Sequence, residues 1–245
     1  MNTVKDRVAI ITGGTRGIGF AIAKKLAEEG YKLALNYSGN DAAAESALNE
    51  IKKISSNVIL VKGDVADEDV MEKAFDDTVK AFGGVDVVIN SAGIMALSPV
   101  SELDLDVLDR IHRTNIRGTF VVNQQAARKV RSGGAIINFS TTVKKLAFPG
   151  YGAYAASKGA VDALVPVLAK ELRGKDITVN AVAPGPTATA LFFEGKDEET
   201  IERFSKSSPL ERLGKPEDMA EVVSFLAGPA RWVNGQIIYT NGGII

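Results

Sequence analysis

Near the start of the 245-residue chain stands the stretch that decides the fold, Val8-Ala-Ile-Ile-Thr12-Gly13-Gly14-Thr15-Arg16-Gly17-Ile18-Gly19. It consists of an apolar run and a glycine-rich turn, and an amphipathic stretch over residues 17–29 follows directly. Glycine lets the backbone turn tightly and lets amide groups approach a diphosphate, while the start of a helix presents unpaired amides to the same anion. The pattern Thr-Gly-x-x-x-Gly-x-Gly between a strand and a helix therefore predicts a nucleotide-binding turn, which comprises Gly13, Thr15, Arg16, Gly17, Ile18 and Gly19.

Short apolar runs alternate with amphipathic stretches along the rest of the chain. The runs predict buried parallel strands at residues 8–12, 33–37, 58–61, 87–90, 135–139, 177–182 and 236–240. The spacing of apolar positions predicts helices at residues 17–29, 41–54, 67–82, 102–130, 151–173 and 216–227. Such alternation needs right-handed crossovers, which place helices on both faces of a parallel sheet. No Pro/Gly/Ser-rich linker divides the series, so the sequence predicts an α/β fold with one doubly wound domain, 1–245, built on a seven-stranded parallel sheet.

The composition narrows the class of protein further. Hydrophobic residues make up 45% and charged residues 24% of the chain, as in ordinary soluble domains. A net charge of -1 offers no broad basic surface, so we expect neither a nucleic-acid nor a membrane partner. The absence of cysteine excludes disulfides and thiolate catalysis. Neither a secretory signal nor a membrane-spanning run is apparent, so a cytoplasmic protein is expected.

One segment interrupts the alternation of strands and helices. After Pro184-Gly185-Pro186, the chain mixes Leu191, Phe192 and Phe193 with the polar stretch 194–200. Long connections inside a domain are uncommon and often form lids over a site. We therefore predict a substrate lid over residues 186–208, with a plain surface excursion as the alternative.

The end of the second strand bears on the choice of nucleotide. It reads Asn36-Tyr37-Ser38, about twenty residues after the glycines, where an acidic residue would hold a ribose 2′-hydroxyl and repel a 2′-phosphate. No acidic residue occurs there before Asp41, and the guanidinium of Arg16 can pair with a phosphate. These features predict NADP(H) rather than NAD(H), with Asn36, Tyr37 and Ser38 at the adenosine end.

Two later stretches suit the same crevice. Asp64-Val65 follows the third strand, and Asn90-Ser91-Ala92-Gly93 follows the fourth. An aspartate can accept from an adenine amine, and small residues let the backbone run beside a cofactor. We therefore expect both stretches to line the nucleotide site.

The candidate catalytic groups are Tyr154 and Lys158, which lie four residues apart on one face of a helix. A free phenol has a pKa of about 10, and a nearby ammonium brings it toward the working range of an acid–base catalyst. A tyrosine and a lysine four residues apart are common by chance, so the position of the pair in the fold must support the catalytic assignment. The fifth strand ends in a cluster of hydroxyls, at Ser140-Thr141-Thr142, which could polarise a substrate carbonyl. Asn115, in the fourth helical segment, could steady a water molecule that returns protons toward Lys158.

These motifs occur in the order and spacing of the short-chain dehydrogenase/reductase family, which the chain resembles over essentially its whole length. The branch it most resembles is that of the bacterial 3-oxoacyl-[acyl-carrier-protein] reductases. The resemblance implies a Rossmann-type fold, NAD(P)(H), an Asn-Ser-Tyr-Lys tetrad and, in most members, a tetramer. The matching stretches are Thr12–Gly19, Asn90–Gly93, Asn115, Tyr154 with Lys158, Pro184-Gly185, Asn234-Gly235-Gln236 and Asn241-Gly242-Gly243.

The resemblance also assigns residues to roles. Asn115, Tyr154 and Lys158 match three members of the tetrad, and the nicotinamide side of the site would include Pro184, Gly185, Thr187 and Thr189. Thr189 matches the threonine that usually contacts the nicotinamide carboxamide.

The serine of the tetrad has no clean match. Family spacing places it thirteen residues before Tyr154, at Thr141, while Ser140 stands one place earlier. We prefer Thr141, because alternate strand residues point to opposite faces, and keep Ser140 as the alternative. Lys144 and Lys145 also depart from the family pattern. They either favour an anionic substrate or acidic carrier protein, or form a solvated loop pair.

Three other features receive no part in the chemistry. His112 is the only histidine, and we expect it at a helix surface or an interface. The acidic run Asp197-Glu198-Glu199 favours a solvated helix start over a metal site, and no metal is expected. Pro166 lies inside a predicted helix, which it should kink.

The sequence thus predicts NADPH-dependent reduction of a carbonyl (ketone, aldehyde or 3-oxoacyl group), with hydride from the nicotinamide and the proton from Tyr154. Met95 and Leu97, together with the apolar residues of the predicted lid, favour an apolar or acyl-bearing substrate, a class that includes acyl thioesters. The alternatives are an alcohol or sugar dehydrogenase that works oxidatively, and a non-catalytic NADP(H)-binding redox sensor.

Overall fold

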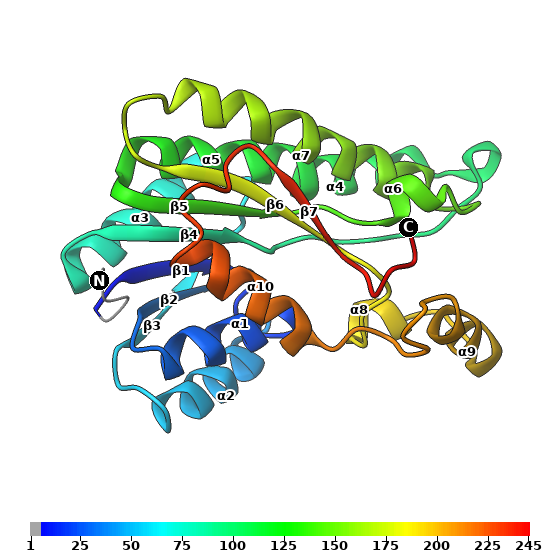
Figure 1. Ribbon diagram of the computed structural model, residues 1–245, viewed down its shortest axis with the longest axis horizontal. Coiled ribbons are helices and arrows are strands. Elements are labelled where there is room, and N and C mark those ends of the chain that lie inside the picture. Colours follow the sequence, from blue (N-terminus) through cyan, green and yellow to red (C-terminus); the bar gives the residue numbers. More distant parts are fainter. Residues whose placement is uncertain (1–5) are drawn as a thin grey trace.

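Seven parallel strands form the centre of the structure, a computed structural model that describes residues 6–245 (Figure 1). Their order across the sheet is β3-β2-β1-β4-β5-β6-β7. The predicted fold is confirmed, and each predicted strand is present. The strands are β1 (Val8–Thr12), β2 (Lys32–Tyr37), β3 (Val58–Lys62), β4 (Val85–Asn90), β5 (Val130–Phe139), β6 (Thr178–Pro184) and β7 (Ile237–Thr240).

The apolar runs are continuous because the sheet is buried on both faces. In β1, Ala9 and Ile11 pack into one core and Ile10 packs into the other, since successive side chains of a strand point to opposite faces. One core lies beneath α1 (Gly17–Glu28) and α10 (Pro216–Ala227). The second lies beneath the helices of the opposite face.

The helices cover the two faces as the alternation predicted (Figure 1). α2 (Asp41–Lys52) lies beside α1 on the first face, and the second face carries α3 (Glu68–Phe82), α4 (Leu105–Ile111), α5 (Gly118–Lys129) and α7 (Gly152–Glu171). Side-chain caps define several starts: Asn40 accepts from the Ala43 amide at 2.9 Å.

The predicted helix over residues 102–130 is divided in the structure. A 3-10 turn, η1 (Val100–Glu102), precedes it, and α4 begins only after Asp104, whose carboxylate accepts from the Asp106 amide at 2.8 Å. A π-helical segment, η2 (His112–Arg117), then joins α4 to α5. Such π insertions occur frequently at functional sites, and this one contains Asn115.

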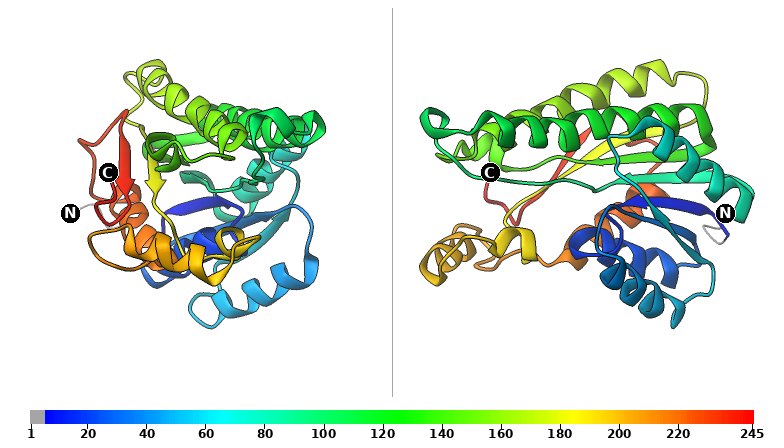
Figure 2. Two further views of the ribbon diagram at one scale, coloured as in Figure 1. Left: turned by 90° about the vertical axis from the view of Figure 1, so that its right-hand side faces the viewer. Right: turned by 180° about the vertical axis from the view of Figure 1, so that it is seen from behind.

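Three further short helices are present: α6 (Val143–Leu146), α8 (Ala190–Phe193) and α9 (Glu198–Lys206). The last two lie within the predicted lid, beyond the carboxyl ends of the strands (Figure 2). The acidic run does start a helix, as predicted, because the Asp197 carboxylate accepts from the Thr200 amide at 2.8 Å. α7 runs through Pro166 without ending there.

The strand order places the site. From β1 the chain builds outward through β2 to β3, and it then returns to the other side of β1 with β4. Helices therefore leave the carboxyl ends of β1 and β4 on opposite faces, which opens a crevice where open α/β sheets bind ligands. Within residues 6–245, the structure contains no helix with the length and apolar character that a membrane span requires.

Candidate active site

The glycine turn packs against the segment after β4, and its glycines are sterically required. A Cβ on Gly13 would lie 3.2 Å from Ala92 Cα, and one on Gly19 would lie 2.3 Å from the Gly13 carbonyl oxygen. Gly13 and Gly17 have φ values of 63° and 52°, where residues with a side chain are strained. Arg16 precedes α1 without making a side-chain cap. The turn is therefore a cradle that fits a diphosphate, with backbone amides at its floor.

Hydrogen bonds fix this cradle to the neighbouring strand. Ser91 Oγ donates to the Thr12 carbonyl at 2.5 Å, and the Ala92 amide donates to Thr12 Oγ1 at 3.1 Å. The two stretches that the sequence assigned to the nucleotide site, the turn and residues 90–93, are thus brought together in the structure.

Two predicted nucleotide-site residues have side chains that point elsewhere. Asn36 donates to the carbonyl groups of Val61 and Gly63, and it is almost fully buried. Asn90 accepts from Thr12 Oγ1 at 2.9 Å within a buried polar network. Their side chains hold strands together, so only their backbone atoms can face a nucleotide.

The residues predicted to hold the adenosine end follow the second strand. β2 ends at Tyr37, Ser38 after it is exposed, and Arg16 in the glycine turn is exposed as well. The Asp41 carboxylate forms an ion pair with Lys62 at 2.8 Å, and no acidic residue within 6–245 pairs with Arg16. The guanidinium of Arg16 is therefore available to an anionic ligand.

Asp64 and Val65 lie at the next strand end, where their contacts differ. The Asp64 carboxylate accepts from the Ala66 amide at 2.9 Å and pairs with Arg113. Val65 is buried against α5, since a Cβ on Gly118 would lie 2.6 Å from its side chain. Asp64 keeps lone pairs for an adenine amine, whereas the Val65 side chain is a packing element.

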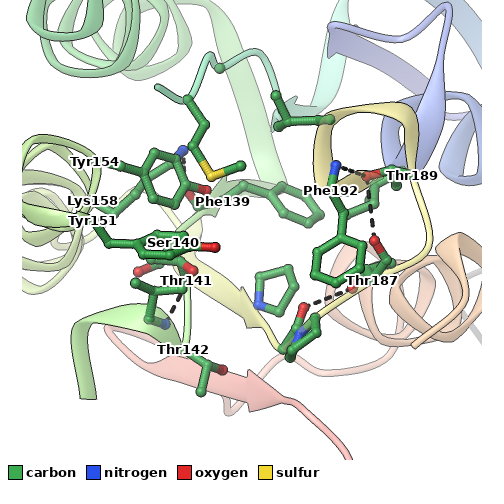
Figure 3. A pocket seen from close by; sticks show the side chains of 18 of the residues that line it. Phe139, Ser140, Thr141, Thr142, Tyr151, Tyr154, Lys158, Thr187, Thr189 and Phe192 are labelled. Carbon is green, nitrogen blue, oxygen red and sulfur yellow. Dashed lines mark hydrogen bonds between the residues drawn. The ribbon is translucent and has the colours of Figure 1, made fainter. Parts of the chain in front are cut away.

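Tyr154 and Lys158 lie on one wall of a pocket, as predicted from their spacing on α7 (Figure 3). Lys158 Nζ donates to the Phe139 carbonyl at 2.9 Å and lies 6.0 Å from the centre of the Tyr154 ring. Burial raises the pKa of Tyr154 to about 12, and the nearby hydroxyl of Thr141 opposes that rise. Burial and, to a smaller extent, the positive charge of Lys144 together lower the pKa of Lys158 to about 8. The expectation that Lys158 lowers the pKa of Tyr154 is therefore wrong, because burial outweighs the other influences, and the phenol keeps its proton at neutral pH.

Asn115 connects this pair to the end of β4. Its amide nitrogen donates to the Ile94 carbonyl at 2.9 Å and to Ser157 Oγ at 3.0 Å, and its oxygen accepts from the Ile94 amide. A Cβ on Gly93 would lie 3.4 Å from the Asn115 oxygen and 3.5 Å from Lys158 Nζ. Glycine at position 93 thus leaves a gap between the two polar groups.

The two candidate hydroxyls have different surroundings. Ser140 Oγ donates to an Asp162 carboxylate oxygen at 2.5 Å and accepts from Lys144 Nζ at 2.7 Å. Thr141 Oγ1 instead accepts from the Val143 amide at 3.3 Å, and its hydroxyl lies near enough to Tyr154 to lower the pKa of the phenol. Lys144 also forms an ion pair with Asp162, and its side chain is only 12% exposed. The solvated-loop interpretation is therefore wrong for Lys144, although Lys145 is exposed. Sequence reasoning missed Asp162, which stands one helical turn beyond Lys158.

The pocket beside these groups is open to solvent, and the space within it, including open solvent, is about 890 Å³. Aromatic rings from three segments meet at its edge: Phe204 of α9 lies 5.4 Å from Phe148 and 5.5 Å from Phe192 of α8, ring centre to ring centre. Figure 3 shows Phe192 and Thr189 across the pocket from Tyr154. The predicted lid thus supplies one wall.

The expected apolar lining is partly correct. Met95, Leu191 and Phe192 line the pocket, but Leu97 and Phe193 are exposed residues outside its lining. The sequence analysis did not identify Phe148, Tyr151 or Phe204 as lining residues, because no local pattern links these distant positions.

Thr187 and Thr189, from the loop after β6, complete the nicotinamide side that the resemblance implied. Both line the pocket, together with Pro184 and Gly185. Thr189 Oγ1 accepts from the Phe192 amide at 3.2 Å and so caps α8. The same residue therefore stands at the base of the lid and beside Gly17, whose Cβ would lie 3.6 Å from it.

A glycine cradle at the switch point of a doubly wound sheet, with a tyrosine–lysine pair beside it, defines a dinucleotide-binding oxidoreductase. The comparisons with known proteins give the family. Residues 13–245 match a family model described as "Enoyl-(Acyl carrier protein) reductase". The chain belongs to the short-chain dehydrogenase/reductase family, and the predicted family and enzyme class are confirmed.

Three relatives illustrate the similarity. A "Short-chain type dehydrogenase/reductase" of Picea abies is 43% identical over 97% of this chain and 92% of the relative. An "NADPH-dependent aldehyde reductase-like protein, chloroplastic" of Arabidopsis thaliana is 40% identical over 98% and 94%. The structure of a short-chain dehydrogenase from Burkholderia cenocepacia in complex with NADP superposes with a TM-score of 0.92, at 33% identity over 99% of both chains.

Proposed function

We propose that the protein uses NADPH to reduce the carbonyl group of an uncharged, apolar small molecule to an alcohol. The observation that carries this proposal is the convergence of Tyr154, Lys158 and the Thr141 hydroxyl on one wall of an apolar pocket beside the glycine turn. The substrate would be a ketone, an aldehyde or a 3-oxoacyl group. The name of the Arabidopsis relative, an NADPH-dependent aldehyde reductase-like protein, supports the reaction class.

NADP(H) is the proposed cofactor, and the Burkholderia structure with bound NADP supports it. The diphosphate would rest on residues 13–19, the adenosine end on residues 36–38 and 64–65, and the nicotinamide end beside residues 90–93, Tyr154, Lys158 and residues 184–189. When bound, the nicotinamide supplies the hydride. The exposed Arg16 guanidinium would pair with the 2′-phosphate.

The Arg16→Ala variant should therefore lose affinity for NADPH selectively. One lost charge-assisted hydrogen bond predicts a rise in the KM for NADPH of about 10- to 100-fold, with the KM for NADH little changed. Steady-state kinetics with both cofactors would measure this. Lys24→Ala, which removes an exposed cation from the same helix away from the turn, is the control and should behave as wild type. Unchanged NADPH affinity in Arg16→Ala, or higher wild-type affinity for NADH than for NADPH, would contradict the assignment.

Tyr154 acts as the proton donor in this proposal. Its phenol is protonated at neutral pH, and Thr141, whose hydroxyl lies near it, would hold the carbonyl oxygen of the substrate at the same point. The ammonium of Lys158 stabilises the negative charge that the phenol gains as it gives up its proton. Asn115 orients Ile94 and Ser157, and the gap at Gly93 would admit a water molecule between Asn115 and Lys158.

The lid, residues 186–208, is proposed to select the substrate and exclude water. Its Leu191, Phe192 and Phe204 face the pocket, and Lys158 is the only charged residue among the lining side chains of the described chain. Since an uncompensated charge is costly in such surroundings, a neutral substrate is favoured.

Consumption of NADPH with a panel of aldehydes, ketones and acetoacetyl thioesters tests the function. Turnover of apolar carbonyls supports the proposal, and preferential turnover of alcohols with NADP⁺ would instead favour the oxidative alternative. Cofactor binding without turnover of any carbonyl or alcohol would favour a redox sensor.

We further propose a homotetramer, as the family resemblance implies. Exposed apolar side chains occur in two regions: Phe225 and Trp232 on α10 and the loop that follows it, and Phe120 and Val167 on α5 and α7. Two such surfaces, each of which pairs with the same surface of another subunit, generate a tetramer with closed symmetry.

A cytoplasmic location stays a prediction, since the Arabidopsis relative is named as chloroplastic.

Light scattering after size-exclusion chromatography should give a mass about four times the 25.9 kDa of the chain. Phe120→Glu/Val167→Glu and, separately, Phe225→Glu should each yield dimers, because each disrupts only one pairing surface. A monomeric wild-type protein, or tetramers of both variants, would show that these surfaces are not the interfaces.

A further inference from the structure

A partly buried polar cluster lies next to the proposed catalytic groups. It consists of Ser140 at the end of β5, Lys144 on α6 and Asp162 on α7. Ser140 Oγ lies 2.5 Å from one carboxylate oxygen of Asp162 and 2.7 Å from Lys144 Nζ, and Lys144 pairs with the other carboxylate oxygen. The lysine and aspartate side chains are only 12% and 25% exposed. Each polar group of the cluster therefore has a partner within it.

The cluster continues the row of functional residues on α7. Tyr154, Lys158 and Asp162 are spaced by four residues, so they lie along one face of that helix. Lys144 reaches the same face from α6, and its charge acts on Lys158. The strand end that holds Thr141 is thereby tied on one side to α6 and on the other to α7.

We propose that Lys144 and Asp162 are positioning residues of the catalytic site. They hold Ser140 away from the substrate and leave Thr141 facing Tyr154. In addition, the Asp162 carboxylate compensates the positive charge of Lys144 close to Lys158. The inference rests on the proposed function. It also accounts for the position of Lys144, because a lysine beside Lys158 would repel it unless a carboxylate neutralised it.

The charged and titratable groups around Lys158 come from several elements. Tyr154, Tyr151 and Asp162 belong to α7 or its start, Lys144 and Lys145 to α6, and Tyr239 of β7 lies 5.9 Å from Lys144 Nζ. Lys145 is exposed, and its charge acts on Lys144, whereas Lys144 is the lysine whose charge acts on Lys158. Asp162 is therefore the one acidic group within this set. Removal of Asp162, or removal of its partner Lys144, should change the electrostatic potential at Lys158 more than removal of any other group in the set.

The pH dependence of kcat/KM for carbonyl reduction reports that potential. Activity should fall as pH rises, because Lys158, whose pKa burial lowers to about 8, then loses the charge that stabilises the phenolate. In Asp162→Asn, the unpaired positive charge of Lys144 favours deprotonation, so the alkaline limb should move to lower pH. In Lys144→Met, the unpaired carboxylate favours the protonated form, so the limb should move to higher pH. Each shift should be on the order of one pH unit.

The double variant Lys144→Met/Asp162→Asn removes both charges. Its alkaline limb should return close to the wild-type pH, with a remaining shift of less than about a third of the shift in either single variant. It also leaves no isolated buried charge, so it should fold even if a single variant does not. Lys145→Met is the matched control and should leave the limb in place. The conservative Asp162→Glu should likewise keep the wild-type profile.

The test is the set of pH profiles of kcat/KM, measured with NADPH and a carbonyl that the wild type reduces. Opposite shifts in the two single variants, with return in the double variant, would establish the positioning role. Unshifted limbs, shifts in the same direction, or a double variant that stays displaced would overturn it. Failure of the wild type to reduce any carbonyl would instead reject the proposed function.

Discussion

The Tyr154→Phe variant should lose carbonyl reduction almost completely, with a fall in kcat of about 10³-fold or more. The substitution removes one oxygen atom and leaves the ring in place, so packing in the pocket should be preserved. Without the phenol, the developing alkoxide loses its proposed proton donor. Because burial raises the pKa of the Tyr154 phenol to about 12, the phenol is protonated at neutral pH.

The measurement is the initial rate of NADPH consumption with saturating substrate, accompanied by a titration of NADPH binding. Binding should change by less than about threefold, because the cradle for the diphosphate lies in the glycine turn. Tyr151→Phe is the matched control, since it removes a hydroxyl from the same pocket without touching the lysine-paired phenol. A Tyr154→Phe enzyme that retained a tenth or more of the wild-type kcat would exclude Tyr154 as the donor.

Thr141→Ala should produce the second largest effect, a loss of about 10²- to 10³-fold in kcat. The hydroxyl of Thr141 lies near Tyr154 and would hold the substrate oxygen, whereas the hydroxyl of Ser140 is held by Asp162 and Lys144. Ser140→Ala should therefore cost less than about tenfold. Thr141→Ser keeps the hydroxyl and should retain most of the activity.

Comparison of kcat for these three variants decides which residue takes the role of the family serine. If Ser140→Ala were more damaging than Thr141→Ala, the strand end would present its side chains the other way. The stability of each variant should be checked by thermal unfolding, so that a loss of folded protein is not read as a loss of chemistry.

Most of the fold could be predicted from the sequence for a simple physical reason. Parallel strands that are covered on both faces have sequences that are short apolar runs, and the glycine turn after Val8–Thr12 indicates the first strand-to-helix crossover. The boundaries of α4 and the π-helical segment were not predictable, because they depend on the Asp104 cap and on the contacts of Asn115. The four-residue helices α6 and α8 are too short to show a helical period.

In the candidate site, too, some residues could be predicted from the sequence and others could not. Tyr154 and Lys158 were identifiable because both lie on one helix at a fixed spacing. The roles of Asp162 and Phe204 depend on which distant segments meet, and local pattern contains no such information. The orientation of Asn36 and Asn90 was likewise hidden, since a residue at a strand end can face either the crevice or the sheet.

The central claim is that hydride from the cofactor and a proton from Tyr154 reach the same carbonyl. Its most direct test is the fate of deuterium from NADPH that is labelled at the reactive nicotinamide carbon, followed by mass spectrometry of the alcohol. The account predicts that the wild type places the label on the carbinol carbon, while Tyr154→Phe forms almost no labelled product in the same time. Unlabelled alcohol from the wild type, or labelled alcohol formed by Tyr154→Phe at the wild-type rate, would contradict it.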